Sequence, residues 1–294
     1  QHESMTTLKS TIPIKKYQGT GNDFVVVDER HSIGDRPSFA VQYCDRQTGV
    51  THESASQVGA DGVLFLELDC SPNSPRVLMT LVQPDGSLAP MCGNGARIAA
   101  AWGADQAEVS NIVINTPVGA RRAVVDDETI RVEMGVPRFS PSAIPLDHDK
   151  PLIDTPLGEL NVTSVNTGVP HAVAIVSDVD AIDLEAVAPP VRHAECFPRG
   201  TNVTLAQQTG PYSFAQRTYE RGVEGETRSC GTGAVAVAAV AHRLQRIDSH
   251  ATVSVSPPGG LLEVTVPKTG QATLAGPVSH EFTTNVERVE STVE

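Results

Sequence analysis

Short runs of apolar and β-branched residues, separated by glycine, proline and polar residues, recur along the chain. Their length and composition are typical of β-strands, and turn signals such as Pro84-Asp85-Gly86 indicate that most of them form hairpins. The clearest predicted strands are residues 23–29, 62–68, 76–83, 111–116, 171–178, 251–256 and 261–267.

Two helices stand out from this strand-rich pattern, and we expect them to begin at Ala96 and Ala234. Each follows a Cys-Gly-Xaa-Gly segment, the first at Cys92 and the second at Cys230. Alanine and other apolar residues dominate both helices on nearly all sides. A helix of this kind is buried, so each is predicted to lie inside an envelope of strands.

The order of elements after the first cysteine is repeated after the second. In both places a small-residue helix is followed by a strand, a Pro-Xaa-Gly turn that begins at Pro117 or Pro257, and further strands. The period of this repeat exceeds a hundred residues. A repeat on this scale indicates two homologous halves formed by duplication of one domain.

The division of the chain follows from this repeat. We predict an N-terminal half over residues 5–138 and a C-terminal half over residues 139–275, because the junction is rich in proline and polar residues. Residues 276–294 are expected to form a final strand and tail that could return to the N-terminal half. Residues 1–4 precede a methionine and are interpreted as a remnant of expression.

Charge and hydropathy narrow the possible partners. The formal net charge is −13, with five lysines and seventeen arginines, which argues against nucleic acid because phosphate binding needs clustered cations. No apolar run approaches the length of a membrane span, and no leader pattern follows Met5. The expectation is therefore a cytoplasmic protein that binds neither nucleic acid nor membrane.

The five cysteines do not form a disulfide framework, because their number is odd and their spacing irregular. Cys44, Cys70 and Cys196 lack glycine-rich surroundings and are interpreted as small buried or incidental thiols. No Cys-Xaa-Xaa-Cys or His-Xaa-Xaa-Xaa-His spacing is present, so no metal site is predicted.

Cys92 and Cys230 are the candidate chemical groups. If the halves face each other across a cleft, the two thiols approach a ligand from opposite sides. Each is predicted to stand at a helix N-terminus, which favours an anion and is expected to lower the pKa of the thiol. The backbone N–H groups expected to hold a carboxylate there are those of Gly93, Asn94, Gly231 and Thr232.

Two thiols on opposite faces of one carbon suit racemisation. One thiolate would remove the α-proton while the other thiol delivers a proton to the opposite face. A redox dithiol would also explain facing cysteines, but it would not explain the paired anion-holding glycines. A dinucleotide-binding fold would need an alternation of strands and helices that this chain lacks.

These features resemble the diaminopimelate epimerase family. The resemblance runs in order from about residue 14 to residue 282 and rests on the segments GTGNDFVVVD, DGSLAPMCGNGAR, NTGVPHAV, RGTNV, YERGVEGETRSCGTGA and PPGGLLEV. It implies an α+β fold of two pseudosymmetric halves, each a mostly antiparallel sheet wrapped round a central helix, paired as a homodimer. It also implies conversion of LL-diaminopimelate to the meso form in lysine biosynthesis without pyridoxal phosphate or another cofactor.

The resemblance assigns roles to individual residues of this chain. Cys92 matches the proton donor and Cys230 the proton acceptor, and the roles exchange with the direction of reaction. Glu220 and Arg221 match the pair that reads the distal end of the substrate, and Glu220 also matches a group that tunes the thiols. Further assignments are ligand contacts at Asn22 and Asn202, thiol tuning at His171 and a dimer contact at Phe282. Asn22 and Asn202 could instead be turn residues, and His171 could be a packed core residue.

Three departures from the family pattern bear on the substrate. Gln83 stands where the family has a substrate-reading asparagine, and Val169 replaces another asparagine for which Asn166 could substitute. About seven additional residues, 51–57, form a polar loop that is expected to be exposed, and Glu224 lengthens the link to the second cysteine. A two-thiol racemase of proline, hydroxyproline or histidine therefore remains an alternative.

Overall fold

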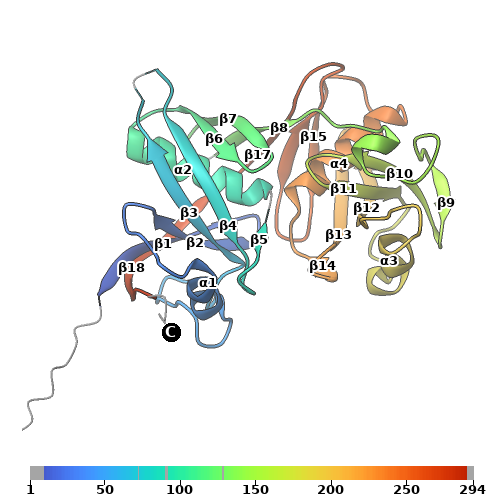
Figure 1. Ribbon diagram of the computed structural model, residues 1–294. Coiled ribbons are helices and arrows are strands. Elements are labelled where there is room, and N and C mark those ends of the chain that lie inside the picture. Colours follow the sequence, from blue (N-terminus) through green and yellow to red (C-terminus); the bar gives the residue numbers. More distant parts are fainter. Residues whose placement is uncertain (1–9, 72, 90–91, 128, 290–294) are drawn as a thin grey trace, which may run out of the picture.

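The computed structural model describes residues 10–71, 73–89, 92–127 and 129–289 (Figure 1). Two lobes of strands lie side by side, and one long helix runs through each of them. The predicted expression remnant, residues 1–4, and the last five residues of the predicted tail, 290–294, lie outside the described residues.

The described strands join in one continuous hydrogen-bonded sheet. In the N-terminal lobe they are β1 (Thr11–Gly19), β2 (Asn22–Asp28), β3 (Gly62–Asp69), β4 (Arg76–Val82), β5 (Leu88–Ala89), β6 (Asn111–Thr116), β7 (Gly119–Val125) and β8 (Ile130–Gly135). The strands that follow in the chain are β9 (Thr155–Leu157), β10 (Leu160–Asn166), β11 (Pro170–Ile175), β12 (Asn202–Gly210), β13 (Ser213–Glu220), β14 (Gly225–Thr227), β15 (Thr252–Ser256), β16 (Leu262–Thr265), β17 (Ala272–Gly276) and β18 (Ser279–Glu287). The helices are α1 (Arg36–Cys44), α2 (Gly93–Ala107), α3 (Leu184–Arg192), α4 (Gly231–Arg243) and a 3₁₀ turn, η1 (Pro141–Ala143).

The two lobes repeat the same pattern of strand pairing. The order β1-β2-β3-β4-β6-β7-β8 in the first corresponds to β10-β11-β12-β13-β15-β16-β17 in the second. Among the described strands, only β2–β3, β4–β6 and their counterparts β11–β12 and β13–β15 pair in parallel. The α+β fold of two pseudosymmetric, mostly antiparallel halves is therefore as expected.

The lobes are joined where β8 pairs with β17, in antiparallel register from Ile130 opposite Gly276 to Gly135 opposite Ala272. After β17 the chain crosses back, and β18 pairs with β1 along nearly its whole length. The last described strand therefore lies beside the first (Figure 1).

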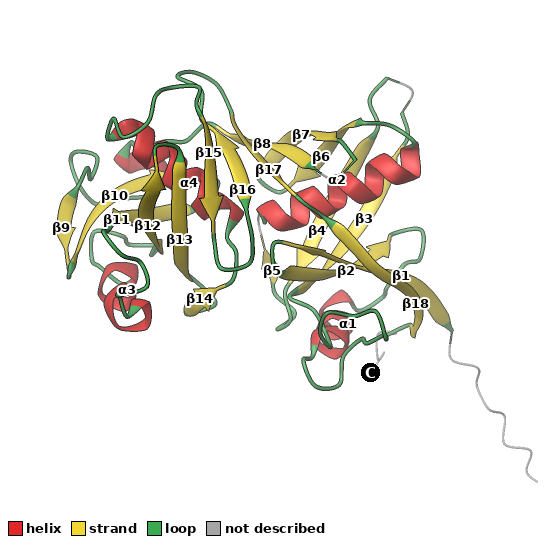
Figure 2. Ribbon diagram, turned by 180° about the vertical axis from the view of Figure 1, so that it is seen from behind, coloured by secondary structure: helices red, strands yellow, loops and turns green. Residues whose placement is uncertain are grey.

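The two central helices are buried because nearly every position carries a small or apolar side chain. Residues 93–100 of α2 and residues 231–241 of α4 are all buried. Figure 2 shows α2 crossing in front of β3 and β4 in its lobe, and α4 lying among the strands of the other lobe. Each helix begins three residues earlier than expected, directly after its cysteine. Because glycine is a poor helix former, the Gly-Xaa-Gly segments are not expected to be helical. In the structure they form the first turn of each helix, since Cys92 and Cys230 occupy the N-cap positions.

Two further helices, α1 and α3, were not expected from the sequence pattern. They cover the other side of their lobes, since alternate residues of a strand face opposite ways. On β3, Leu64 packs in the core around α2 and α4, whereas Phe65 packs with Phe39 of α1. The signal for α1 was local: Asp35 caps the helix by accepting a bond from the Ser38 N–H, and a proline lies in the first turn.

Among the described residues, no helix combines the length and the hydropathy that a membrane crossing requires.

Candidate active site

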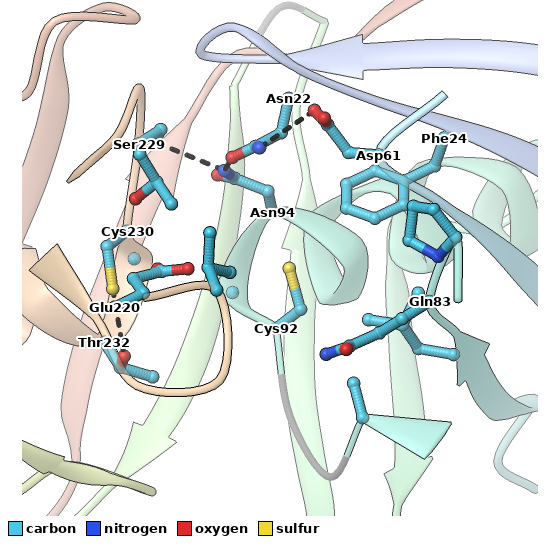
Figure 3. Close-up of a pocket in the computed structure, with 17 residues that line it drawn as sticks. Asn22, Phe24, Asp61, Gln83, Cys92, Asn94, Glu220, Ser229, Cys230 and Thr232 are labelled. Carbon is cyan, nitrogen blue, oxygen red and sulfur yellow. Dashed lines mark hydrogen bonds between the residues drawn. The ribbon is translucent and has the colours of Figure 1, made fainter. Parts of the chain in front are cut away.

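The main candidate site is a cavity of about 340 Å³ between the two lobes. Its walls come from β2, β4 and the start of α2 on one side, and from β13, β14 and the start of α4 on the other (Figure 3). Nine of the site residues expected from the sequence line it: Asn22, Gln83, Cys92, Gly93, Asn94, Glu220, Cys230, Gly231 and Thr232.

The two cysteines occupy equivalent positions in the two lobes. The Sγ atom of Cys92 accepts a hydrogen bond from the Gly95 N–H at 3.3 Å. The Sγ atom of Cys230 lies 3.4 Å from the hydroxyl of Thr232. Cys230 is buried, Cys92 is partly exposed, and both are free thiols that line the same cavity from opposite lobes (Figure 3).

The expectation that a helix start lowers the pKa of these thiols is wrong for this structure. Burial raises the pKa of Cys92 to about 11, although the Gly95 N–H bond opposes the shift. Burial, followed by the charge of Glu220, raises the pKa of Cys230 well above its usual value. Desolvation of the thiolate thus outweighs the helix terminus. Both thiols are therefore protonated near neutral pH, and one of them needs a base to become a thiolate.

Glu220 is placed to be that base. It is the last residue of β13, and its carboxylate lies beside Cys230 in the cavity (Figure 3). Burial raises the pKa of Glu220, while hydrogen bonds with Cys230 and Thr227 oppose the shift. A carboxylate with a raised pKa is a better proton acceptor than an ordinary surface glutamate.

The starts of α2 and α4 form the anion-binding part of the cavity. Gly93 and Asn94 begin one helix, Gly231 and Thr232 begin the other, and all four line the cavity. N–H groups in the first turn of a helix have no partner within the helix and favour a negative group. A carboxylate bound between these two helix starts would lie between the thiols.

Three polar residues that the sequence reasoning did not assign also line the cavity: Asp61, Thr227 and Ser229. Asn94 donates through Nδ2 to the Asn22 Oδ1 and, at 3.2 Å, to the Ser229 hydroxyl. Asn22 in turn donates to Asp61 at 3.0 Å, and Arg46 donates to the same carboxylate at 2.7 Å. Asp61 thus fixes the orientation of the Asn22 amide. The available signal was the GADG turn, in which Asp61 stands directly before β3.

Gln83 and Glu220 hold corresponding positions in the two lobes. Val82 pairs with Val63 in the first lobe as Tyr219 pairs with Val203 in the second, so the next residues correspond. Gln83 begins the turn before β5, where its backbone N–H donates to the Ser87 carbonyl at 2.7 Å. One lobe therefore presents a neutral amide to the cavity and the other a carboxylate.

Three assigned residues, His171, Asn202 and Arg221, lie behind the cavity wall instead of in it. Asn202 accepts the backbone N–H of Arg221 at 2.7 Å, and the Arg221 guanidinium donates to the Arg199 carbonyl at 2.9 Å. Neither Asn202 nor Arg221 is among the residues that line the cavity in this structure, and their assignment as ligand contacts stays a prediction.

His171 is fully buried behind the start of α4. Its Nδ1 lies 2.9 Å from the Thr204 hydroxyl and its Nε2 lies 2.9 Å from the Thr232 hydroxyl. Burial lowers its pKa to about 3, so the ring is neutral. Its hydrogen-bonded path to Cys230 runs through Thr232, whose hydroxyl lies 3.4 Å from the sulfur.

The additional loop, residues 51–57, packs partly against the chain's own β18. The ring of His52 stacks on Phe282 at a centroid distance of 4.9 Å, and Lys16 donates to the Gln57 carbonyl at 3.3 Å. Phe282 is only 4% exposed in the single chain. Its assignment as a dimer contact stays a prediction, and its replacement by a charged residue would disturb the chain's own core.

Asn166 does not take the place of the family asparagine that Val169 replaces. Its amide donates to the Ala143 carbonyl at 2.7 Å and accepts the Gly168 N–H at 2.8 Å. It lines a different cavity, which also contains Arg121 and Arg138. Within the part of the chain that the structure describes, no group of three or more His, Cys, Asp or Glu side chains could hold a metal ion.

Comparisons with known proteins agree with this arrangement. The family model of diaminopimelate epimerase matches residues 14–140 and 163–281. A diaminopimelate epimerase of Methanocella arvoryzae is 41% identical over 270 residues, which cover 88% of this chain and 90% of the relative. One of Methanothrix thermoacetophila is 41% identical over 261 residues, with coverage of 85% and 87%.

More distant solved structures share the fold. A hydroxyproline epimerase from Agrobacterium vitis has a TM-score of 0.62 at 14% identity, covering 95% of this chain and 93% of its own. A probable proline racemase from Agrobacterium radiobacter has a TM-score of 0.63 at 16% identity, with coverage of 94% and 92%. Since the family model spans most of the chain and the two relatives match nearly their full length, this chain belongs to the diaminopimelate epimerase family.

Proposed function

We propose that this protein interconverts LL-2,6-diaminopimelate and meso-diaminopimelate, as an isomerase that exchanges a proton between two thiols and the α-carbon. The observation that carries the proposal is the placement of Cys92 and Cys230, which cap α2 and α4 and line one cavity from opposite lobes. Family membership supports the choice of substrate.

The proton balance of the reaction is simple. Glu220 takes the proton of Cys230, and the resulting thiolate removes the α-proton from one face of the substrate. Cys92 then gives its thiol proton to the opposite face, so that one C–H bond breaks, another forms, and the configuration inverts. The forward reaction leaves Cys92 as a thiolate and one proton on Glu220. In the reverse direction the Cys92 thiolate removes the α-proton, Cys230 protonates the opposite face, and Glu220 returns its proton to Cys230.

The weak acidity of the α-proton is the main chemical obstacle. The first-turn N–H groups of α2 and α4 would hold the substrate carboxylate and stabilise the charge that develops next to it. Burial raises the pKa of both thiols, and a thiolate of higher pKa is a stronger base. The same burial keeps water from the carbanion.

The second amino-acid group of diaminopimelate needs its own partners. Asn22, Asp61 and Gln83 line the same cavity beyond the two helix starts. Arg221 would reach a distal carboxylate only after its guanidinium leaves the Arg199 carbonyl. A substrate-induced movement of this turn is therefore part of the proposal, and Arg221 is the residue that tests it.

We further propose that the enzyme works as a cytoplasmic homodimer, without a nucleic-acid or membrane partner, in lysine biosynthesis. The resemblance to the family supports this assignment. Sedimentation of the purified protein tests the dimer directly.

The deciding experiment is incubation in deuterated buffer with a panel of amino acids, followed by detection of deuterium at the α-carbon. Diaminopimelate should exchange, and proline, hydroxyproline and histidine should not. Exchange with one of these three but not with diaminopimelate would overturn the substrate and favour the alternative racemase.

A further inference from the structure

The two thiols have different surroundings on their buried sides. Behind Cys230, five polar side chains of the C-terminal lobe are linked in series, and we call them the polar chain: Gln216, Thr218, Thr204, His171 and Thr232. Four of them are at most 2% exposed, and Thr232 is 4% exposed where it meets the cavity. A run of buried polar side chains is costly to assemble, the more so because the Oε1 atom of Gln216 has no hydrogen-bond partner among the described residues. The polar chain therefore calls for an explanation.

At the matching strand positions that the structure describes, the N-terminal lobe has no such chain. The strand registers pair Phe24 with Gly62 as they pair His171 with Asn202, so Phe24 corresponds to His171. The same registers put apolar residues at the other strand positions of the polar chain: Leu64 for Thr204, Leu81 for Thr218 and Met79 for Gln216. All four counterparts belong to the hydrophobic core. The fold that the two lobes share therefore does not require the polar chain, which ends beside Cys230.

The direction of the hydrogen bonds is set at the Gln216 end. The Nε2 group of Gln216 lies 3.2 Å from the Cys230 carbonyl and 3.0 Å from the Thr218 hydroxyl. A carbonyl only accepts, so the NH₂ group must face it and donates to Thr218 as well. The Thr218 hydroxyl then donates to Thr204 at 3.2 Å. The opposite direction would leave the Thr218 proton without an acceptor among the described residues.

From Thr204 the direction passes through the histidine ring. Thr204 donates to Nδ1 of His171, so the proton of the neutral ring is on Nε2, which donates to the Thr232 hydroxyl. The Nδ2 group of Asn202, itself a donor, also faces Nε2, but at 3.4 Å, beyond the usual hydrogen-bond distance, whereas the Thr232 hydroxyl lies at 2.9 Å. The Thr232 proton is then left to point at the Cys230 sulfur, 3.4 Å away (Figure 3).

We propose that the polar chain donates a hydrogen bond to the sulfur of Cys230 and thereby stabilises its thiolate. The inference deepens the proposed function and rests on it. The chain members other than Thr232 do not line the cavity, so they are positioning residues that act through Thr232.

The charged groups near the chain act in the opposite sense to its last hydrogen bond. Glu220 on β13 faces Cys230 and raises its pKa, whereas the bond from Thr232 lowers it. Arg221 lies near His171 and helps to keep the ring neutral. The polar chain thus offsets part of the rise in the pKa of Cys230 that burial and Glu220 cause. No equivalent chain of described residues reaches Cys92 in the first lobe.

The test is the pH dependence of alkylation by iodoacetamide, read separately for Cys92 and Cys230 by peptide mass. Thr204→Val removes one hydroxyl from the chain, and Gln216→Met introduces the residue of the other lobe. Both should move the alkylation midpoint of Cys230 upward by about one pH unit, since a hydrogen bond to a charged group is worth about that much. The midpoint of Cys92 should not move, and turnover should fall through kcat with little change in KM.

Two controls separate this role from general packing. Thr204→Ser keeps the hydroxyl and should keep the wild-type midpoint. Thr163→Val removes an equally buried hydroxyl, which accepts the Asp154 N–H outside the chain, and should leave both midpoints unchanged. An unchanged Cys230 midpoint in Thr204→Val, or equal shifts of both thiols, would overturn the proposal. Absence of α-hydrogen exchange in the wild type would instead reject the proposed function, because alkylation is measured without turnover.

Discussion

Gly93 and Gly231 meet backbone to backbone at the point where α2 and α4 begin. A Cβ atom built on either residue would lie 3.2 Å from the Cα of the other, and one built on Gly231 would also lie 2.9 Å from Cδ2 of Leu274. The helix starts approach this closely because neither residue has a side chain. This contact brings two sets of first-turn N–H groups to one cavity.

Gly231→Ala is therefore expected to impair the enzyme. Helix propensity alone would favour alanine by about 1 kcal/mol, but here the new methyl group would push the two helix starts apart. A displacement of this kind should lower turnover by about a hundredfold. Gly225→Ala is the matched control, because its Cβ would meet only Glu185 Oε1, at 3.6 Å. Wild-type turnover in Gly231→Ala would show that the contact is not needed.

Replacement of either cysteine at a helix start should abolish epimerisation. Cys92→Ala and Cys230→Ala each remove the proton carrier on one face of the substrate, and such groups contribute about 10²–10⁴-fold to the rate. Cys70→Ala, at an exposed thiol, should retain full activity. If either alanine variant keeps more than about a hundredth of wild-type turnover, the two-thiol mechanism is wrong.

Alkaline pH should destabilise the protein through its buried thiols. Burial raises the pKa of Cys92 from 9.0 to about 11, so between these values the unfolded chain loses a proton that the folded protein keeps. This contribution is fully present below pH 9 and is lost as the pH rises toward 11. Denaturant unfolding at a series of pH values should show a steeper loss for the wild type than for Cys92→Ala. Parallel curves would mean that the thiol has its ordinary acidity in the folded state.

Arg221 should affect diaminopimelate more than any amino acid with a single carboxylate. Arg221→Lys keeps the charge but loses the paired donors of a guanidinium, and Arg221→Ala loses both. We expect Arg221→Ala to lose about 2–5 kcal/mol of transition-state stabilisation with diaminopimelate, measured as kcat/KM. Circular dichroism should be unchanged. Normal epimerisation by Arg221→Ala would mean that another residue reads the distal end.

Most of the fold could be predicted from local sequence patterns. The strand runs are bounded by glycine and proline, and β6 occupies the residues expected for it, Asn111–Thr116. The central helices are unusual in being small or apolar on all sides, which indicated their burial. By contrast, α3 contains Pro189 and Pro190 within the helix. The chain packs this helix against β12 and β13 through Leu184, Ala188 and Val191, whose spacing is helical. The two prolines argued against a helix and concealed this signal.

The site residues whose chemistry follows from residue type and local sequence could be predicted. Those whose role depends on contacts in the folded structure could not. Cys92 and Cys230 could be recognised as candidates from the glycine-rich segments that follow them. The sense of their pKa shifts could not be read from the sequence, because it depends on how deeply the lobes bury them. Asp61 was not assigned for a similar reason, since its role depends on contacts with Asn22 and Arg46 that are distant in sequence from one another.

The pairing of β18 with β1 has a consequence for the order in which the molecule is made. On the ribosome, β1 emerges long before β18, so one of its two neighbours is not available until residue 287 has been synthesised. The N-terminal lobe therefore waits, with an open edge, for the whole C-terminal lobe to be translated. A nascent chain stopped before β18 should expose β1 to other strands and aggregate more readily than the finished protein.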